Sequence, residues 1–112
     1  DAPLSLHRHW LARRGYVPTQ LLALRLKSGG MEPSLNIGDI FVIDTAEAEL
    51  RDGLVFAVNF YGEVLVRRAQ REGGGWWLVA DNPDQARYPR KACAGPDCVP
   101  IGRLIFKQSE SI

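Results

Sequence analysis

The sequence has few of the residues that mark specialised classes of protein. Its 112 residues include 2 Cys and 2 His, and His7 and His9 point about 200° apart on a helix, so we expect no metal site and no cofactor. The formal net charge is +1, with 14 Lys and Arg against 13 Asp and Glu, which excludes a broad basic surface for nucleic-acid phosphates. No apolar run approaches the roughly 20 residues of a membrane span, so we expect no membrane partner.

The two cysteines, Cys93 and Cys98, lie in the segment ACAGPDCVP. Gly95 and Pro96 between them allow a turn that would bring the two sulfurs together, so a disulfide stays open. Reduced thiols in a turn are the favoured interpretation, because that is the usual state in a cytosolic protein. The chain begins at Asp1 rather than at Met, and we expect it to be a piece of a longer protein.

The hydrophobic pattern predicts mostly strands. Residues 22–28 alternate between apolar and polar side chains, whereas 38–44 form a nearly continuous apolar run that is typical of a strand covered on both faces. Residues 54–60 and 63–70 flank the dipeptide Tyr61-Gly62 and predict a β-hairpin, with Leu54, Phe56, Val58 and Phe60 on one face. The remaining predictions are a helix over 4–16, a helical turn after Pro18, a turn at 72–75, strands over 76–81 and 101–108, and a long loop over 81–100.

The fold class that we expect is mostly β. The chain has no internal repeat, no low-complexity tract and no linker in its middle, so we predict one domain over residues 1–112. Consecutive hairpins and a long return rich in Gly and Pro favour a small, strongly bent sheet or a half-open barrel, with a short N-terminal helix.

Residues 29–45 read GGMEPSLNIGDIFVIDT, and they carry a family resemblance. The segment resembles the serine motif of LexA-type and phage-repressor self-cleaving domains, where a serine precedes a Met-x-Pro or similar triplet, followed by Gly-Asp and an apolar strand. The segment at 62–70, GEVLVRRAQ, resembles the one that carries the family's catalytic lysine, and PIGRLIF at 100–106 is similar to its closing strand. The residues that match the triplet and the Gly-Asp pair are Met31, Glu32, Pro33, Gly38 and Asp39.

The resemblance assigns the nucleophile and the base to positions where this chain has neither. Gly30 stands in the place of the serine, and Arg67 stands in the place of the lysine. A Ser-Lys dyad needs a lysine with a neutral lone pair that can take the serine proton. Glycine has no side chain, and a guanidinium stays protonated and offers no acceptor. We therefore expect no catalytic residues and no peptidase activity.

Other interpretations stay open beside this one. An active autoprotease would need a relocated dyad among Ser28, Ser34, Lys27 and Lys91, but a shift of two residues moves an oxygen by about 6–7 Å, beyond hydrogen-bond reach. An engineered inactive mutant of an autoprotease would also contain these replacements. The signal-peptidase branch shares the Ser-Met-x-Pro frame, yet its members need a membrane anchor, and none is visible here.

The frame around Gly30 also has a purely structural interpretation. Gly30 would form a tight turn, Met31 would fill the core, and Pro33 would fix the turn. Arg67 could pair with a carboxylate such as Glu32 or Asp39, or it could be solvated.

The resemblance implies the dimerisation or oligomerisation domain of a phage-type transcriptional repressor. It implies a homodimer or a higher homo-oligomer, operator DNA bound through an upstream helix-turn-helix domain that this chain lacks, and a cytoplasmic location. An antirepressor protein is a further candidate partner. Trp76 and Trp77 must point to opposite faces of a strand, so we expect one in the core and the other partly exposed, where it could anchor a partner or simply pack at an edge. The candidate interface consists of Trp76, Trp77, Ile101, Leu104 and Phe106.

Overall fold

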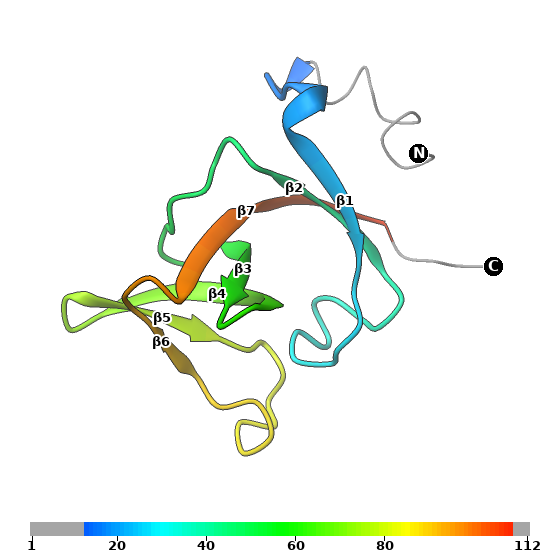
Figure 1. Ribbon diagram of the computed structural model, residues 1–112. Helices are drawn as coiled ribbons and strands as arrows, with labels where there is room; N and C mark the ends of the chain where they lie inside the picture. Colours follow the sequence, from blue (N-terminus) through cyan, green and yellow to red (C-terminus); the bar gives the residue numbers. More distant parts are fainter. Residues whose placement is uncertain (1–12, 109–112) are drawn as a thin grey trace.

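The structure, a computed structural model, describes residues 13–108 and consists of one open antiparallel sheet. Its seven strands lie in the order β1-β2-β7-β3-β4-β5-β6 (Figure 1). The mostly-β prediction is therefore confirmed, whereas most of the helix predicted over 4–16 lies outside the described residues. The elements are η1 (Pro18–Gln20, a 3-10 helix), β1 (Leu21–Arg25), β2 (Ile40–Asp44), β3 (Val55–Phe60), β4 (Glu63–Glu72), β5 (Gly75–Val79), β6 (Lys91–Cys93) and β7 (Cys98–Gln108).

The hairpin of β3 and β4 forms around Tyr61-Gly62, as the sequence predicts. Tyr61 has a φ of 52° and Gly62 a φ of 87°, which are the left-handed values that a type I′ turn requires. The side chain of Asn59 accepts a hydrogen bond from the N–H of Gly62 at 2.9 Å. The turn between β4 and β5, at 73–74, also has two glycines with positive φ.

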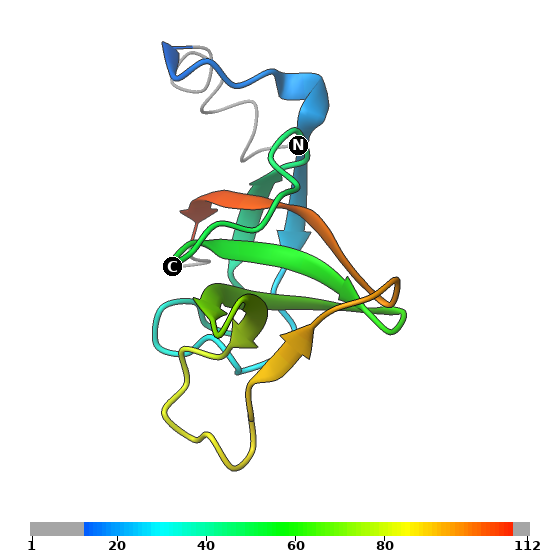
Figure 2. The same cartoon turned by 90° about the vertical axis from the view of Figure 1, so that its left-hand side faces the viewer.

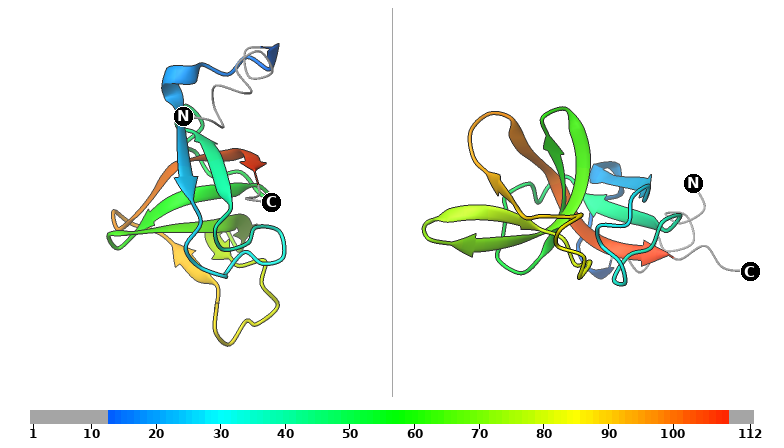
Figure 3. Two further views of the ribbon diagram at one scale, coloured as in Figure 1. Left: turned by 90° about the vertical axis from the view of Figure 1, so that its right-hand side faces the viewer. Right: turned by 90° about the horizontal axis from the view of Figure 1, so that it is seen from below.

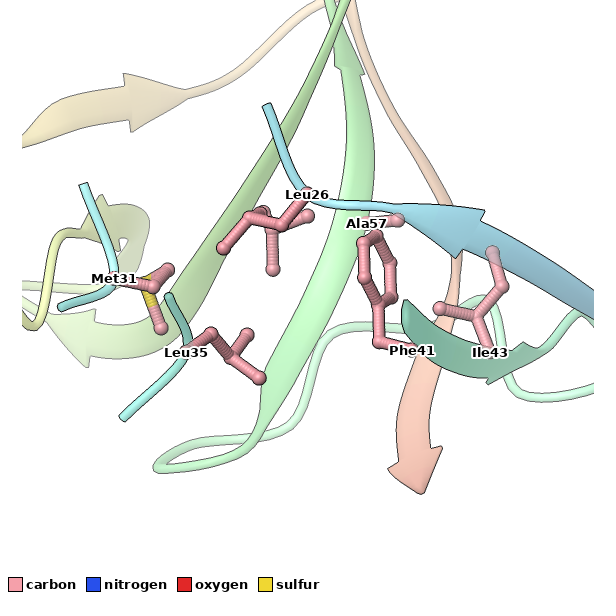
Figure 4. Packing of buried hydrophobic residues seen from close by; sticks show 7 residues of the cluster. Leu26, Met31, Leu35, Phe41, Ile43 and Ala57 are labelled. Carbon is pink, nitrogen blue, oxygen red and sulfur yellow. The ribbon is translucent and has the colours of Figure 1, made fainter. Parts of the chain in front are cut away.

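Strand β3 is buried on both faces, whereas the hydrophobic pattern predicted burial of only one face. Phe56 and Val58 are fully buried and pack with Ala69 and Leu78, as the predicted apolar face requires. Ala57 points the other way and is equally buried, in the cluster that Figure 4 shows. The run over 38–44 was correctly predicted to be covered on both faces, since β2 is buried along most of its length.

The sheet curls so strongly that its first strand approaches β4. Leu26, just after β1, packs in one cluster with Val66 of β4, although β2, β7 and β3 lie between these strands in the sheet. Register shifts opposite β7 occur between Val42 and Ile43 and between Ala57 and Val58, and such bulges increase twist. Figure 2 shows the result, with β1 running across the direction of β3 and β4. The strongly bent sheet that we predicted is thus present.

The prediction of a long loop over 81–100 is wrong for the second half of this range. Strand β6 pairs with β5 there, and β7 already begins at Cys98. A disulfide joins Cys93 at the end of β6 to Cys98, with the two Cα atoms 5.4 Å apart. The favoured interpretation of reduced thiols is therefore not what the structure shows. The Gly-Pro turn brings the sulfurs together because the strands on either side of it position both cysteines.

No helix within residues 13–108 is long and apolar enough to cross a membrane.

Candidate functional site

The site is built on the loop of residues 28–35, which joins β1 to β2. Met31 and Leu35 are buried and insert into the cluster that also contains Leu26 and Phe41 (Figure 4). The loop closes on itself, because the N–H of Leu35 donates to the carbonyl of Met31 at 2.9 Å. The Glu32–Pro33 peptide is cis. Met31 fills the core, as its structural interpretation expects.

The Gly-Asp pair forms the turn that leads into β2. Gly38 has a φ of 95°, a conformation that other residues rarely adopt. The buried carboxylate of Asp39 accepts a hydrogen bond from the N–H of Asn36 at 2.9 Å. The backbone N–H of Asp39 donates to the carbonyl of Asn36 at 3.0 Å. Asp39 is therefore occupied in closing the turn.

The structure brings residue 30 and residue 67 into contact. A Cβ atom built on Gly30 would lie 2.6 Å from Nη1, 2.7 Å from Cζ and 2.8 Å from Nη2 of Arg67. These distances are far below van der Waals contact, so the guanidinium fills the space that any side chain at position 30 would need. In this conformation, Arg67 can keep its place only because position 30 is a glycine.

Arg67 is buried, with 6% of its surface exposed, and no acidic side chain pairs with it in the part of the chain that the structure describes. Among residues 13–108, no carboxylate oxygen lies within 4 Å of its guanidinium, so the predicted pair with Glu32 or Asp39 is wrong, and so is a solvated Arg67. Its Nη1 donates to the carbonyl of the neighbouring Val66 at 2.8 Å, and its Cζ lies 5.8 Å from the ring centre of Tyr88. Burial lowers the pKa of Arg67, and the nearby Tyr88 partly offsets that shift.

A second loop, at residues 81–88, holds the first in place (Figure 3, left). The backbone N–H of Asn82 donates to the carbonyl of Gly30 at 3.0 Å, and its side-chain amide donates to the carbonyl of Gly29 at 2.8 Å. The hydroxyl of Ser34 donates to Asp81 at 2.6 Å. Three hydrogen bonds therefore fix the backbone around Gly30 from outside.

Asp81 is itself fixed by Arg68 of β4. Nε of Arg68 donates to one carboxylate oxygen at 3.0 Å and Nη2 donates to the other at 2.7 Å, a bidentate pair. This hydrogen bonding is the main reason why the pKa of Asp81 is lowered and that of Arg68 is raised. Arg67 and Arg68 are neighbours on one strand, yet among the described residues Arg68 has a counter-ion and Arg67 has none.

The sequence indicated only part of this site. Residues 81–83 begin the loop predicted over 81–100, and the side chain of Asn82 accepts a hydrogen bond from the N–H of Asp84 at 2.9 Å, which is typical of a turn. These residues also hold the loop of residues 28–35 in place, and this second role could not be predicted from the spacing of residues in the sequence. Tyr88 was missed altogether, because nothing about a tyrosine in a Pro-rich segment indicates that it covers Arg67.

The candidate interface residues lie at two separate places in the sheet. Trp76 and Trp77 are both half-buried rather than one buried and one exposed. Cζ of Arg71 lies 5.2 Å from the ring centre of Trp76, and Cζ of Arg90 lies 3.9 Å from that of Trp77. The other three residues, on β7, are half-buried as well: Ile101, Leu104 and Phe106.

Residues 13–108 contain no group of three or more His, Cys, Asp or Glu side chains that could hold a metal ion. The site around Gly30 therefore consists of backbone, one buried guanidinium, a tyrosine and polar clamps.

A curled antiparallel sheet whose first long loop carries a Met-Glu-Pro triplet opposite the hairpin strand β4 defines a peptidase-like domain. The chain matches the Peptidase S24-like family over residues 2–105, and it belongs to that family. Over 49 residues it is 41% identical to LexA repressor 1 of Pseudomonas syringae pv. tomato, and this segment is 44% of the chain and 24% of that protein. The LexA repressors of Pseudomonas chlororaphis and Ectopseudomonas mendocina match to the same extent, at 41% and 39% identity. The aligned segment thus spans about a quarter of the length of these relatives.

Proposed function

We propose that this chain is a non-cleaving self-association domain of a LexA-like transcriptional repressor. The observation that carries the proposal is the contact between Gly30 and Arg67. These are the positions that the resemblance assigns to the nucleophile and the base, and here one has no side chain and the other is a permanent cation.

A relocated dyad has little support in the geometry around the site. The hydroxyl of Ser34 donates to Asp81, a carboxylate that Arg68 already neutralises. The amine of Lys107 lies near Ser34 but donates to its backbone carbonyl at 3.1 Å rather than accepting from its hydroxyl. The amine of Lys91 lies over the ring of Phe60, 5.6 Å from its centre. Neither lysine is buried, whereas a general base of this type is held in a buried site.

Self-association is supported by the open edge of β7. Within residues 13–108, β7 pairs with β3 from Cys98 to Arg103 and with β2 from Arg103 to Gln108, so the segment 104–108 has β2 on one side and no strand on the other. A strand edge that has no neighbouring strand among residues 13–108 and that carries the half-buried side chain of Leu104 is suited to pairing with a second copy. A dimer would place two DNA-binding domains on the two halves of a palindromic operator. Operator DNA, an antirepressor and a cytoplasmic location are further parts of this proposal.

Sedimentation equilibrium of this chain at micromolar concentrations tests the proposal. We expect a reversible dimer or a larger assembly, and Phe106→Lys should weaken it by about tenfold or more, because a buried charge at an interface is costly. Val99→Lys is the matched control, since Val99 lies at the other end of the same strand and is already 52% exposed. A strict monomer at high concentration, or equal effects of the two variants, would contradict the proposal.

A further inference from the structure

The two cysteines of the disulfide have different surroundings. Cys93 is the final residue of β6, the last strand of the sheet, and it is half-buried. Cys98 begins β7, lies opposite Phe60 of β3, and is buried with 7% of its surface exposed. A thiolate breaks a disulfide by attacking one of its sulfurs, and the rate depends on access to the sulfur that is attacked. A dissolved thiol should therefore attack at Cys93.

An open recess on the surface leads to Cys93. It has a volume of about 480 Å³, and Glu49, Leu50, Arg71, Trp76 and Cys93 are among the residues that line it. Three of them come together through the strand register. Arg71 of β4 lies opposite Trp76 of β5, and Trp76 lies opposite Cys93 of β6. Because directly opposite residues share one face of a sheet, a guanidinium and an indole ring lie beside the more exposed cysteine.

Two charged side chains of opposite sign belong to this recess. Cζ of Arg71 lies 5.2 Å from the ring centre of Trp76, and among residues 13–108 no carboxylate oxygen lies within 4 Å of its guanidinium. The carboxylate of Glu49 likewise forms no ion pair in the described part of the chain. Both residues are exposed, so both are accessible to a dissolved molecule. A ligand that carries a carboxylate and an ammonium group has a partner for each charge.

We propose that Cys93 is a site of thiol–disulfide exchange with small thiols that carry a carboxylate and an ammonium group, which Arg71 and Glu49 hold in the recess. The thiolate of the small molecule attacks Sγ of Cys93, the bond to Cys98 breaks, and Cys98 leaves as a thiolate that takes up a proton. The sulfur of the small thiol is oxidised and that of Cys98 is reduced, so the step needs no further oxidant. The product is a mixed disulfide on Cys93, and the covalent link between β6 and β7 is lost.

The proposed cytoplasmic location would supply thiols of this class. Disulfides in that compartment are usually transient, and they serve in catalysis or in redox sensing. The exchange itself depends neither on that location nor on self-association of the chain. Its test can therefore fail while the proposed function stands, and the reverse also holds.

The test is incubation of the unaltered chain with reduced glutathione, whose carboxylates and ammonium group fit this description. Samples taken at early times are quenched with excess N-ethylmaleimide and mapped by mass spectrometry of peptides. We expect glutathione on Cys93 and the maleimide on Cys98, with the opposite arrangement less abundant by about tenfold or more, because only Cys93 is accessible to attack. Equal labelling of the two cysteines, or a disulfide that stays intact at millimolar glutathione over hours, would overturn the proposal.

A charge substitution tests the role of the recess. Arg71→Gln should slow the reaction with glutathione by about threefold or more, because a carboxylate of the thiol loses its partner. Arg87→Gln is the matched control, since Arg87 is also exposed but does not line the recess, and it should leave the rate unchanged. With cysteamine, which has the ammonium group but no carboxylate, Arg71→Gln should not slow the reaction. Equal effects of the two substitutions, or an equal loss with cysteamine, would show that Arg71 does not hold the thiol.

Discussion

Two buried glycines, Gly102 and Gly30, show what separates the scaffold of this molecule from its site. A Cβ on Gly102 of β7 would lie 2.6 Å from the carbonyl oxygen of Asp44 and 3.1 Å from Cα of Thr45, so it meets backbone. A Cβ on Gly30 would meet only the end of the Arg67 side chain, at 2.6 Å. The first contact fixes how β7 and β2 approach. The second contact makes the residue at position 30 depend on the side chain at position 67, and it places no constraint on the position of the backbone.

A glycine can be required for different reasons within one fold. Where the added Cβ would meet backbone, no single second substitution can make room, because strands cannot move without breaking the sheet. Where the added Cβ would meet a side chain, a second substitution that shortens this side chain can make room. A changed pair of residues at positions 30 and 67 can therefore be accommodated while Met31, Leu35 and the clamp from Asn82 hold the loop in position.

The largest effect should come from Gly102→Ala. The added methyl would press on the backbone of Asp44 and Thr45, and we expect the free energy of unfolding to fall by about 3 kcal/mol. Urea denaturation measures the change. Gly75→Ala is the matched control, because its Cβ would come no closer than 3.9 Å to the carbonyl of Glu72, and it should cost under about 0.5 kcal/mol. Similar losses for both variants would remove the distinction.

Gly30→Ala should cost less, about 2 kcal/mol, because the flexible end of Arg67 can move at the price of its buried position. In a background of Arg67→Ala the same change should cost at least about 1 kcal/mol less, since the new methyl then enters vacated space. A double-mutant cycle from urea denaturation measures this coupling. Costs that simply add, within about 0.5 kcal/mol, would show that the two positions are independent.

The smallest effect concerns the clamp at Asp81. Because its pair with Arg68 lowers the pKa of Asp81 in the folded chain, the stability from this pair is present above the unfolded value of 3.8 and is lost as the pH falls through the lower folded value. Asp81→Asn should cost about 1 kcal/mol at pH 7, a modest figure because Arg68 is partly exposed.

The pH dependence gives this last prediction its control. The gap between the unaltered chain and Asp81→Asn should close in acid, well below pH 3.8, whereas the control Asp97→Asn should leave the stability at pH 7 almost unchanged. The side chain of Asp97 is exposed and forms no ion pair among residues 13–108, where its backbone carbonyl accepts a hydrogen bond from Tyr61. A gap that persists in acid would assign the stability to the shape of the side chain rather than to its charge.

Much of the scaffold could be predicted from sequence, because its signals are local. The Tyr61-Gly62 hairpin, the glycine turn before β5 and the apolar run of β2 each depend on a few adjacent residues. The burial of Ala57 and the position of β6 could not be predicted, because both depend on how the sheet curls. The site was predicted only to the level of positions 30 and 67. That Arg67 lies over Gly30 without a carboxylate depends on Tyr88 and Asn82, which approach from more than 50 residues away along the chain from Gly30.

Incubation of the unaltered chain under alkaline conditions tests most directly whether the domain is unable to cleave itself. High pH would deprotonate a lysine base and so favour any Ser-Lys dyad present. We expect an intact chain by mass spectrometry after prolonged incubation, because Gly30 supplies no nucleophile and Arg67 stays protonated. Discrete fragments that form at a rate independent of protein concentration would contradict it, since they would show an intramolecular nucleophile elsewhere in the chain.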